Sequence, residues 1–206
     1  MGRNSIKDIR QKEIVKMFYQ VAKKEGLENT SIAKIAKVMD INPSLIMHYF
    51  KTKEELVYAL VDFILDKYLL IYKVEVNNGK SLKYSLVTTI NSIFSKKWNR
   101  LFDDGVFYSC YSLTFRDKKI KNMYKNLSNT LRKKLANLLD SCVNDHIIHI
   151  EDPIDTADLI YVLIDGAYYY LSMIDDKIEA ETKLNNYKKE AFKLLGIEDA
   201  ATFLLE

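Results

Sequence analysis

Apolar residues recur at intervals of three and four along most of the chain, which is the spacing of amphipathic α-helices. Ile14, Met17, Phe18 and Val21 mark the first such stripe. Few residues interrupt the pattern, because the 206 residues include only six glycines and two prolines. The pattern therefore predicts an all-α fold, with helices at about 7–25, 31–39, 43–50, 52–76, 81–101, 106–115, 117–146, 154–176 and 180–196.

Local signals define the ends of the first three helices. Gly26 is a typical C-terminal stop for the first helix. Thr30 or Ser31 supplies the N-cap of the second helix. Asn42 caps the third helix, and Pro43 takes its first position, where the missing N–H does no harm. The second and third helices are therefore both short and are separated by a tight turn.

Two short helices joined by a three- or four-residue turn are typical of a helix-turn-helix. The small side chain of Ala36 lets the two helices cross closely, and neighbouring isoleucines supply apolar contacts. In a DNA-binding helix-turn-helix, the second helix enters the major groove. Here it would point Phe50 into the core and present outward Pro43, Ser44, Met47 and His48.

Charge separates the N-terminal part of the chain from the rest. The chain carries 31 Lys/Arg and 28 Asp/Glu, a net charge of +3. Residues 1–53 hold 11 basic and 5 acidic side chains, a net of +6, whereas the remainder has a net of −3. The basic surplus lies where an acidic polymer could bind, although a solvated, lysine-rich surface would give the same count.

A family resemblance becomes clear from these residues. The segments T-S-I-A-K-I-A-K-V-M-D-I (30–41) and N-P-S-L-I-M-H-Y-F-K-T-K-E-E-L (42–56) follow an amphipathic first helix. Together, residues 7–56 resemble the DNA-binding domain of the TetR family of bacterial transcription regulators, and H-Y-F-K-T-K-E-E-L is the most specific part. L-I-D-G-A (163–167) resembles the dimerisation helix of that family.

The resemblance implies an all-α homodimer with two domains in each subunit. Residues 1–52 would form a three-helix, helix-turn-helix DNA-binding domain. Residues 53–206 would form a helical ligand-binding and dimerisation domain, of which 53–78 are the long connecting helix. The partners implied are double-stranded DNA, a small-molecule effector and a second copy of the chain.

The resemblance also implies which residues contact DNA. Phosphates would be held by Thr30, Ser31, Tyr49 and Lys53, and the groove would be met by Pro43, Ser44, Leu45, Met47 and His48, with Asn42 at the start of the helix. Two positions depart from the family pattern. Asp40 replaces a glycine that is common in the turn, and aspartate tolerates left-handed geometry. Met47 replaces a common tyrosine, which would remove one phosphate or base contact.

The C-terminal part is rich in aromatic side chains that could line an effector pocket. The chain has 14 tyrosines and one tryptophan, a composition that favours a cavity with hydroxyl groups for an apolar or amphipathic molecule. Ordinary core packing is the alternative interpretation of the same residues. The candidate lining is Trp98, Phe102, Phe107, Tyr108, Tyr111, Phe115, Tyr124 and Tyr168.

The helix at about 154–176 is apolar nearly all round, so it should be buried on several sides. With the last helix, it could form a four-helix bundle with a second copy of the chain. The expected interface residues are Leu163, Ala167, Tyr170, Leu171 and Ile174. Such a dimer would hold two recognition helices roughly 34–36 Å apart, about one turn of DNA. Asp165 would cap a partner, pair across the dimer, or meet a cationic ligand.

No pattern of an enzyme, a cofactor site or a metal site stands out. The sequence has no glycine-rich phosphate loop, no Cys-x-x-Cys and no His-Glu-x-x-His. His146 and His149, near Asp145 and Asp152, form the one conceivable metal site, but polar residues are usual at a helix end. We therefore expect no catalytic residue, no cofactor and no metal.

The remaining features favour a cytoplasmic protein. Cys110 and Cys142 read as small buried hydrophobes, with a redox pair as the alternative. No signal peptide is visible, and the most apolar run, 159–174, is shorter than the roughly 20 residues of a membrane span. The sequence thus predicts no membrane partner.

The function predicted from the sequence is ligand-responsive regulation of transcription. The simplest form is a repressor that binds a pseudo-palindromic operator as a homodimer and leaves it when a small apolar or amphipathic effector binds. An activator, or a DNA-binding helical protein that senses nothing, would have the same sequence features. The effector, the operator and the regulated genes do not follow from the sequence.

Overall fold

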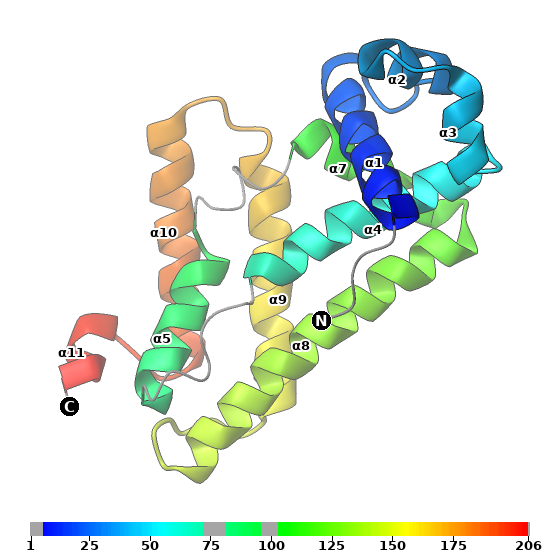
Figure 1. Ribbon diagram of the computed structural model, residues 1–206. Coiled ribbons are helices and arrows are strands. Elements are labelled where there is room, and N and C mark those ends of the chain that lie inside the picture. Colours follow the sequence, from blue (N-terminus) through cyan, green and yellow to red (C-terminus); the bar gives the residue numbers. More distant parts are fainter. Residues whose placement is uncertain (1–5, 72–80, 96–102, 206) are drawn as a thin grey trace. The chain divides into compact units, whose positions relative to one another are not determined.

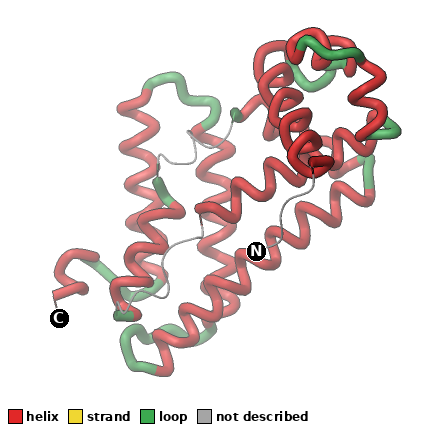
Figure 2. Tube along the Cα trace, viewed as in Figure 1, coloured by secondary structure: helices red, strands yellow, loops and turns green. Residues whose placement is uncertain are grey.

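The computed structural model describes residues 6–71, 81–95 and 103–205. Every regular element in these ranges is a helix, which confirms the all-α prediction (Figure 2). The elements, labelled in Figure 1, are α1 (Ile6–Glu25), α2 (Ile32–Met39), α3 (Pro43–Tyr49), α4 (Lys53–Ile71), α5 (Leu82–Ile93), α7 (Asp104–Ser112), the 3₁₀ helix η1 (Leu113–Phe115), α8 (Lys118–Asn144), α9 (Pro153–Leu171), α10 (Lys177–Leu194) and α11 (Ala200–Leu205).

These helices form two compact units. The first comprises residues 1–68 and 101–125, so that α1, α2, α3 and most of α4 are grouped with α7, η1 and the start of α8. The second comprises residues 69–100 and 126–206 and contains α5, most of α8, α9, α10 and α11. The domain boundary expected between residues 52 and 53 divides the chain by function, and it stays a prediction.

The predicted start and stop residues of the first helices are confirmed. Gly26 follows α1 with a φ of 83°, a left-handed conformation that glycine adopts without strain. Ser31, not Thr30, caps α2, because its hydroxyl accepts the N–H of Lys34. Asn42 caps α3 by accepting the N–H of Ser44, and a proline follows it at the first helical position.

The turn between α2 and α3 depends on Asp40. This residue has φ 52° and ψ 48°, the left-handed conformation expected of it from the sequence. Its N–H bonds the carbonyl of Lys37, and the N–H of Ile41 bonds the carbonyl of Ala36. The α2 helix therefore ends within one residue, and the chain reverses directly into α3.

The first unit has an apolar core built from every helix of the helix-turn-helix. α1 packs against α2, α3 and α7, and α2 packs against α3. The fully enclosed side chains include Ile14, Phe18, Ala22, Ile35, Ala36, Ile46, Leu56, Leu60 and Ile64. Phe50 is also buried, as expected from the sequence. Burial of these side chains is what holds the short helices in place, because isolated helices of seven or eight residues are unstable in water.

Polar contacts join α7 and α8 to this same unit. The backbone N–H of Asp103 donates to the hydroxyl of Tyr19 on α1, with 2.9 Å between the atoms. The hydroxyl of Tyr58 on α4 donates to the carboxylate of Asp117, also at 2.9 Å. Asp103 and Asp117 are at the starts of α7 and α8, so both bonds fix the N-terminal end of a helix.

The second unit has a separate core, formed around the pair of helices α9 and α10. α9 packs against α10, and α5 packs against α10 and α11. Its enclosed side chains include Leu86, Ile90, Ile93, Leu135, Leu139, Cys142, Ile160, Ile164 and Ala191. Asp152 caps α9 and Asp176 caps α10, each accepting two backbone N–H groups of the first turn. Over the described residues, no helix has the length and hydropathy needed to cross a membrane.

Candidate functional site

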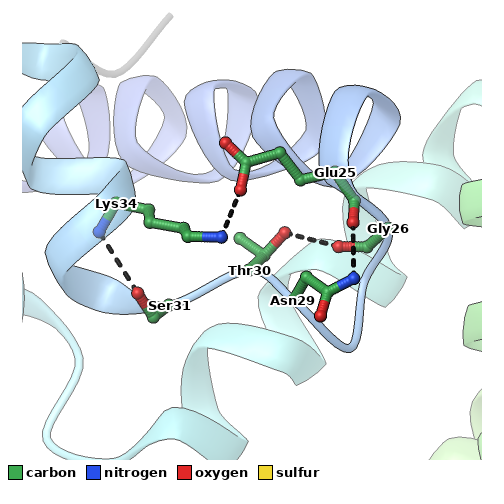
Figure 3. Close-up of polar contacts among 6 residues, drawn as sticks. All are labelled: Glu25, Gly26, Asn29, Thr30, Ser31 and Lys34. Atoms are coloured by element: carbon green, nitrogen blue, oxygen red, sulfur yellow. Dashed lines mark hydrogen bonds and ion pairs between the residues drawn. The ribbon is translucent and has the colours of Figure 1, made fainter.

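The loop before α2 is held by a small network of hydrogen bonds (Figure 3). The hydroxyl of Thr30 donates to the carbonyl of Gly26 at 2.8 Å, and the side chain of Asn29 donates to the carbonyl of Glu25 at 2.9 Å. The ammonium of Lys34 pairs with the carboxylate of Glu25. The network ties the end of α1 to the start of α2, so it fixes the angle at which α2 leaves the first helix.

Thr30 and Ser31 have different positions in this loop. Thr30 is 2% exposed and its hydroxyl donates to the carbonyl of Gly26, so its side chain is enclosed in this conformation. Ser31 is exposed. The Ser31 hydroxyl accepts one N–H as a helix cap, which leaves its own proton for donation to an outside group.

The α3 helix has one buried side and one open side. Ile46 is fully buried and anchors the helix to the core. The residues expected to meet the groove are distributed around it: Pro43, Ser44, Met47 and His48 are exposed, and Leu45 is half-buried. Asn42 is exposed, with its side-chain oxygen engaged in capping. The open side thus presents small, polar and ring side chains from the first turn to the last.

The C-terminal end of α3 is fixed by contacts to its neighbours. The side chain of Gln11 on α1 donates to the carbonyl of Tyr49 at 3.2 Å. The rings of His48 and Tyr49 meet edge to face, with 5.3 Å between their centroids. Lys53 is exposed in the first turn of α4, and Lys51 is exposed just before it. Aromatic and cationic groups therefore flank the open side of α3.

A second candidate site lies around α7. Six rings, which we call the α7 aromatic cluster, form a continuous set of contacts: Tyr68, Phe107, Tyr108, Tyr111, Phe115 and Tyr124. Phe107 is its centre, with ring centroids 5.3 Å from Tyr68 and 5.1 Å from Tyr108. The structure thus brings together five of the eight residues expected to line the pocket. Tyr68 was missed because it lies on α4, far from the others in sequence.

Tyr124 is the cluster member with an unsatisfied polar atom. Its hydroxyl is enclosed and has no hydrogen-bond partner among the described residues. Burial raises the pKa of Tyr124, so the phenol stays protonated and can only gain a bond by finding a partner. The neighbouring Cys110 is fully buried, and burial raises the pKa of its thiol to about 12.

The other three expected pocket residues are not members of this cluster. Tyr168 belongs to the second unit, where its hydroxyl lies 2.7 Å from the carbonyl of Ile93 and 3.1 Å from that of Ser95. Its hydroxyl is therefore satisfied by the backbone next to α5. Trp98 and Phe102 lie outside the described residues.

The α9 helix has an outward face that is largely apolar. We call it the α9 face, and it consists of the exposed residues Leu159, Val162, Gly166, Tyr169 and Tyr170, together with Met173 just after the helix. Of the residues expected at the dimer interface, Tyr170 is on this face, and Leu163, Leu171 and Ile174 are half-buried. Ala167 is 4% exposed and packs within its own subunit. Periodicity could not separate the two sides, because the helix is apolar nearly all round.

An arginine links α8 to α9 beside this face. The guanidinium of Arg132 pairs with Asp158 at 2.7 Å and with Asp165 at 3.3 Å. It also lies over the ring of Tyr161, 5.0 Å from the centroid. Asp165 therefore has a cationic partner within its own subunit.

The described residues do not form a metal site. No group of three or more His, Cys, Asp or Glu side chains among them is arranged to hold a metal ion. His146 adopts a left-handed conformation just after α8, with a φ of 57°. Cys110 and Cys142 are free and buried, and burial raises the pKa of the Cys142 thiol to about 11.

Comparisons with known proteins agree with this arrangement. Residues 19–60 match the model described as "Bacterial regulatory proteins, tetR family", and residues 81–197 match "Tetracyclin repressor-like, C-terminal domain". No curated protein matches the sequence.

Several solved structures share the fold. A TetR transcription regulator from Haloarcula marismortui has a TM-score of 0.78 at 17% identity, over 91% of this chain and 97% of that one. A TetR-family regulator from Cytophaga hutchinsonii has a TM-score of 0.77 at 16% identity, over 96% and 98%. A protein from Saccharomonospora viridis, solved in complex with choline, has a TM-score of 0.71 at 15% identity, over 87% and 95%.

These identities establish the fold, whereas the two sequence models together cover most of the chain and establish the family. Members of this family regulate transcription and are not enzymes. The chain, with its helix-turn-helix and its helical C-terminal domain, belongs to the TetR family of transcription regulators.

Proposed function

We propose that this protein is a cytoplasmic, homodimeric repressor that binds a pseudo-palindromic operator and is released by a small apolar or amphipathic effector. The observation that carries the proposal is the two-sided α3 helix. Ile46 is fixed in the core while Ser44, Met47 and His48 stand open to solvent on the other side. A helix anchored in this way can enter a major groove without disturbing the core behind it.

Two kinds of DNA contact are assigned to this surface. Ser44, Met47 and His48 are proposed to meet base edges or the groove wall, which would give sequence preference. Ser31, Tyr49 and Lys53 are proposed to bind phosphates, which would position the protein without reading sequence. The exposure of Ser31 and Lys53 supports these roles, and Thr30 is not included because its side chain is enclosed.

Dimerisation is assigned to the α9 face. Single exposed apolar residues are ordinary on a protein surface, but a continuous apolar patch is typical of an interface. The α9 face repeats apolar residues at intervals of three and four along the helix, with Gly166 in its centre. A Cβ added to Gly166 would meet nothing within 4 Å in the subunit, so the glycine leaves room for a second helix.

Release by an effector requires a link between a ligand site and the DNA-binding helices. The α7 helix supplies one, because it carries three rings of the α7 aromatic cluster, Phe107, Tyr108 and Tyr111, and its N-cap residue Asp103 is hydrogen-bonded to Tyr19 of α1. Lys23 on α1 also approaches the carboxylate of Asp103, at 3.8 Å. A ligand that binds one position of α7 better than the other would shift α1 with it, to the extent of that difference in affinity.

The test is selection of genomic DNA fragments by the purified full-length protein, followed by footprinting at physiological salt. A pseudo-palindrome with half-sites about one helical turn apart is expected. Binding that is weak, strongly salt-dependent and without a preferred sequence would contradict a specific regulator.

Two variants distinguish the two assigned kinds of contact. Met47→Ala should change the sequence preference within each half-site. Lys53→Ala should weaken binding to all sequences alike and reduce the slope of affinity against salt by about one. If both variants weaken binding uniformly, Met47 does not face the bases and the assignment of the groove residues is wrong.

A further inference from the structure

The α7 aromatic cluster contains a side chain, Tyr124, whose buried hydroxyl has no hydrogen-bond partner among the described residues. The ring of Tyr124 packs edge to face against Phe107 and Tyr111, with centroid distances of 6.1 Å and 5.5 Å. Phenylalanine would make the same ring contacts. The hydroxyl is enclosed and unpaired among the described residues, and an unpaired buried hydroxyl is unfavourable. It therefore adds nothing to the packing of the unit in this state.

The two side chains whose proximity raises the pKa of Tyr124 carry no formal charge. Cys110 and Tyr111 are the groups whose proximity raises the pKa of Tyr124, after burial itself. The thiol of Cys110 stays protonated, because burial raises its pKa to about 12. Phe107 and Tyr108 add further neutral rings. A charged ligand would lose its hydration here without gaining an opposite charge from these side chains.

The ring geometry also bears on which ligands fit. A cage for an organic cation presents open ring faces. In this cluster several ring pairs meet edge to face, at interplanar angles of 77° for Phe107 with Tyr108 and 78° for Tyr111 with Tyr124, while Phe107 and Tyr111 are stacked at 18°. An additional flat ring can extend such an edge-to-face arrangement, and aromatic pairs of this kind are favourable beyond the area that they bury.

The cluster is open at one end. Tyr111 is 44% exposed and Phe115 is 80% exposed, whereas the hydroxyl of Tyr124, whose ring contacts Tyr111, is enclosed. Because Tyr111 packs on the ring of Tyr124, a change of the Tyr111 rotamer would uncover that ring. Rotamer changes of exposed side chains are fast, so this path needs no unfolding of α7.

We propose that the α7 aromatic cluster binds an uncharged, largely aromatic molecule whose carbonyl or ether oxygen accepts a hydrogen bond from the Tyr124 hydroxyl. The inference rests on the proposed function, since it assigns the effector site of the same regulator and the chemical class of the effector. The ligand rings bury against Phe107 and Tyr111, and the single acceptor pairs with the hydroxyl of Tyr124. Selectivity arises because a ligand without the acceptor leaves that hydroxyl unpaired.

The experiment uses the full-length protein and three fluorescent probes. Nile red is neutral, polycyclic and carries a carbonyl, crystal violet is a cation, and anilinonaphthalene sulfonate is an anion. Nile red should bind most tightly, and Tyr124→Phe should weaken its binding by about fivefold to tenfold, the value of one neutral hydrogen bond. Tyr111→Ala, which removes an exposed ring of the cluster, should also weaken it.

Tyr168→Phe is the matched control, because its hydroxyl is buried but satisfied by backbone carbonyls. It should leave the binding of Nile red unchanged and lower the melting temperature by about 2 to 4 °C. Tyr124→Phe should leave the melting temperature of the ligand-free protein unchanged or raise it. Weaker ligand binding without lower stability is a combination that a purely structural role of the hydroxyl would not produce.

The outcomes separate this inference from the proposed function. Three results would each overturn the inference. Nile red could bind equally well to wild type and to Tyr124→Phe, or either charged probe could bind more tightly than Nile red in a Tyr124-dependent way. The third is a clear loss of stability in Tyr124→Phe. Titration of operator DNA with and without Nile red then tests the response. Tyr124-dependent binding that leaves operator affinity unchanged would support the ligand site and contradict release by an effector.

Discussion

The separate roles of the Thr30 and Ser31 hydroxyl groups could not be predicted from the sequence. Both residues suit an N-cap and both could bind a phosphate, so the sequence alone left the two interchangeable. The structure separates them, because Thr30 donates to the carbonyl of Gly26 inside the loop while Ser31 caps α2 at the surface. The difference arises because Thr30, four residues after Gly26, is the residue whose hydroxyl reaches the Gly26 carbonyl, whereas Ser31 lies one residue further along.

Replacement of Thr30 by valine tests this distinction. Valine fills the same space but cannot donate, which leaves a carbonyl of the loop without its partner. We expect the free energy of unfolding to fall by about 1 to 2 kcal/mol, measured by urea denaturation. The affinity of the folded protein for operator DNA should not change.

Ser31→Ala is the companion variant at the exposed neighbour. It should lower stability by about 1 kcal/mol through loss of the N-cap, and should also weaken binding to DNA. Stability equal to wild type in Thr30→Val, together with a smaller salt dependence of DNA binding, would instead place Thr30 on a phosphate.

Element boundaries followed closely from the sequence where a cap or a left-handed residue marks them. The start of α3 at Pro43 and the end of α2 before Asp40 were both predicted, since short-range chemistry determines them. The helix expected at 154–176 ends earlier, at Leu171, because Asp176 caps α10 and the chain must turn before it. The small helix α11 was not anticipated.

The turn between α2 and α3 gives a test of backbone conformation. Asp40 has a φ of 52°, where a residue with a Cβ is disfavoured and glycine is not. Asp40→Gly is therefore expected to be more stable than Asp40→Ala by about 1 kcal/mol, measured by thermal or urea unfolding. Equal stabilities would mean that the left-handed conformation at this position is not retained in solution.

Longer-range contacts between elements could not be predicted in the same way. The bond between Asp103 and Tyr19 joins residues 84 positions apart, and that between Tyr58 and Asp117 joins residues 59 positions apart. No periodicity or capping pattern signals either pair. They are nevertheless among the polar contacts that join α7 and the start of α8 to the helices of the helix-turn-helix unit.

Tyr19→Phe is expected to loosen the start of α7. Removal of the hydroxyl frees the Asp103 amide, so its hydrogen exchange should accelerate by roughly fivefold, the equivalent of one lost hydrogen bond. Tyr58→Phe is the matched control and should accelerate exchange at the start of α8 instead. Unchanged exchange at Asp103 in Tyr19→Phe would show that α7 does not depend on α1.

The protein is proposed to act as a homodimer, and the α9 face supplies the side chains of the proposed interface. The sequence indicated an apolar helix at 154–176 and suggested which helix meets a second copy. It did not indicate which side of the helix is free, because buried Ile160 and Ile164 and exposed Leu159 and Val162 are equally apolar. Only the packing of α9 against its own unit decides between the two sides.

Val162→Glu should separate the dimer. Val162 is 57% exposed, so a glutamate there is tolerated in the single subunit but would be buried without a partner against a second α9 face. Sedimentation should show monomers at concentrations at which the wild type is dimeric, and operator affinity should fall by at least about tenfold.

Leu205→Glu provides the control, because Leu205 is exposed and apolar but lies on α11. This variant should remain dimeric. A dimeric Val162→Glu with intact operator binding would move the interface away from the α9 face.

The grouping of α7 with the DNA-binding helices has a consequence for how such a regulator can change over evolutionary time. The nine residues of α7 carry Phe107, Tyr108 and Tyr111, and the residue that caps them holds Tyr19 of α1. A substitution that reshapes the ring cluster for a new small molecule would therefore also strain the attachment to α1. If the cluster binds the effector as proposed, new chemical specificity and unaltered regulation of transcription would be hard to inherit together, and a second, compensating change near Asp103 or Tyr19 should accompany the first.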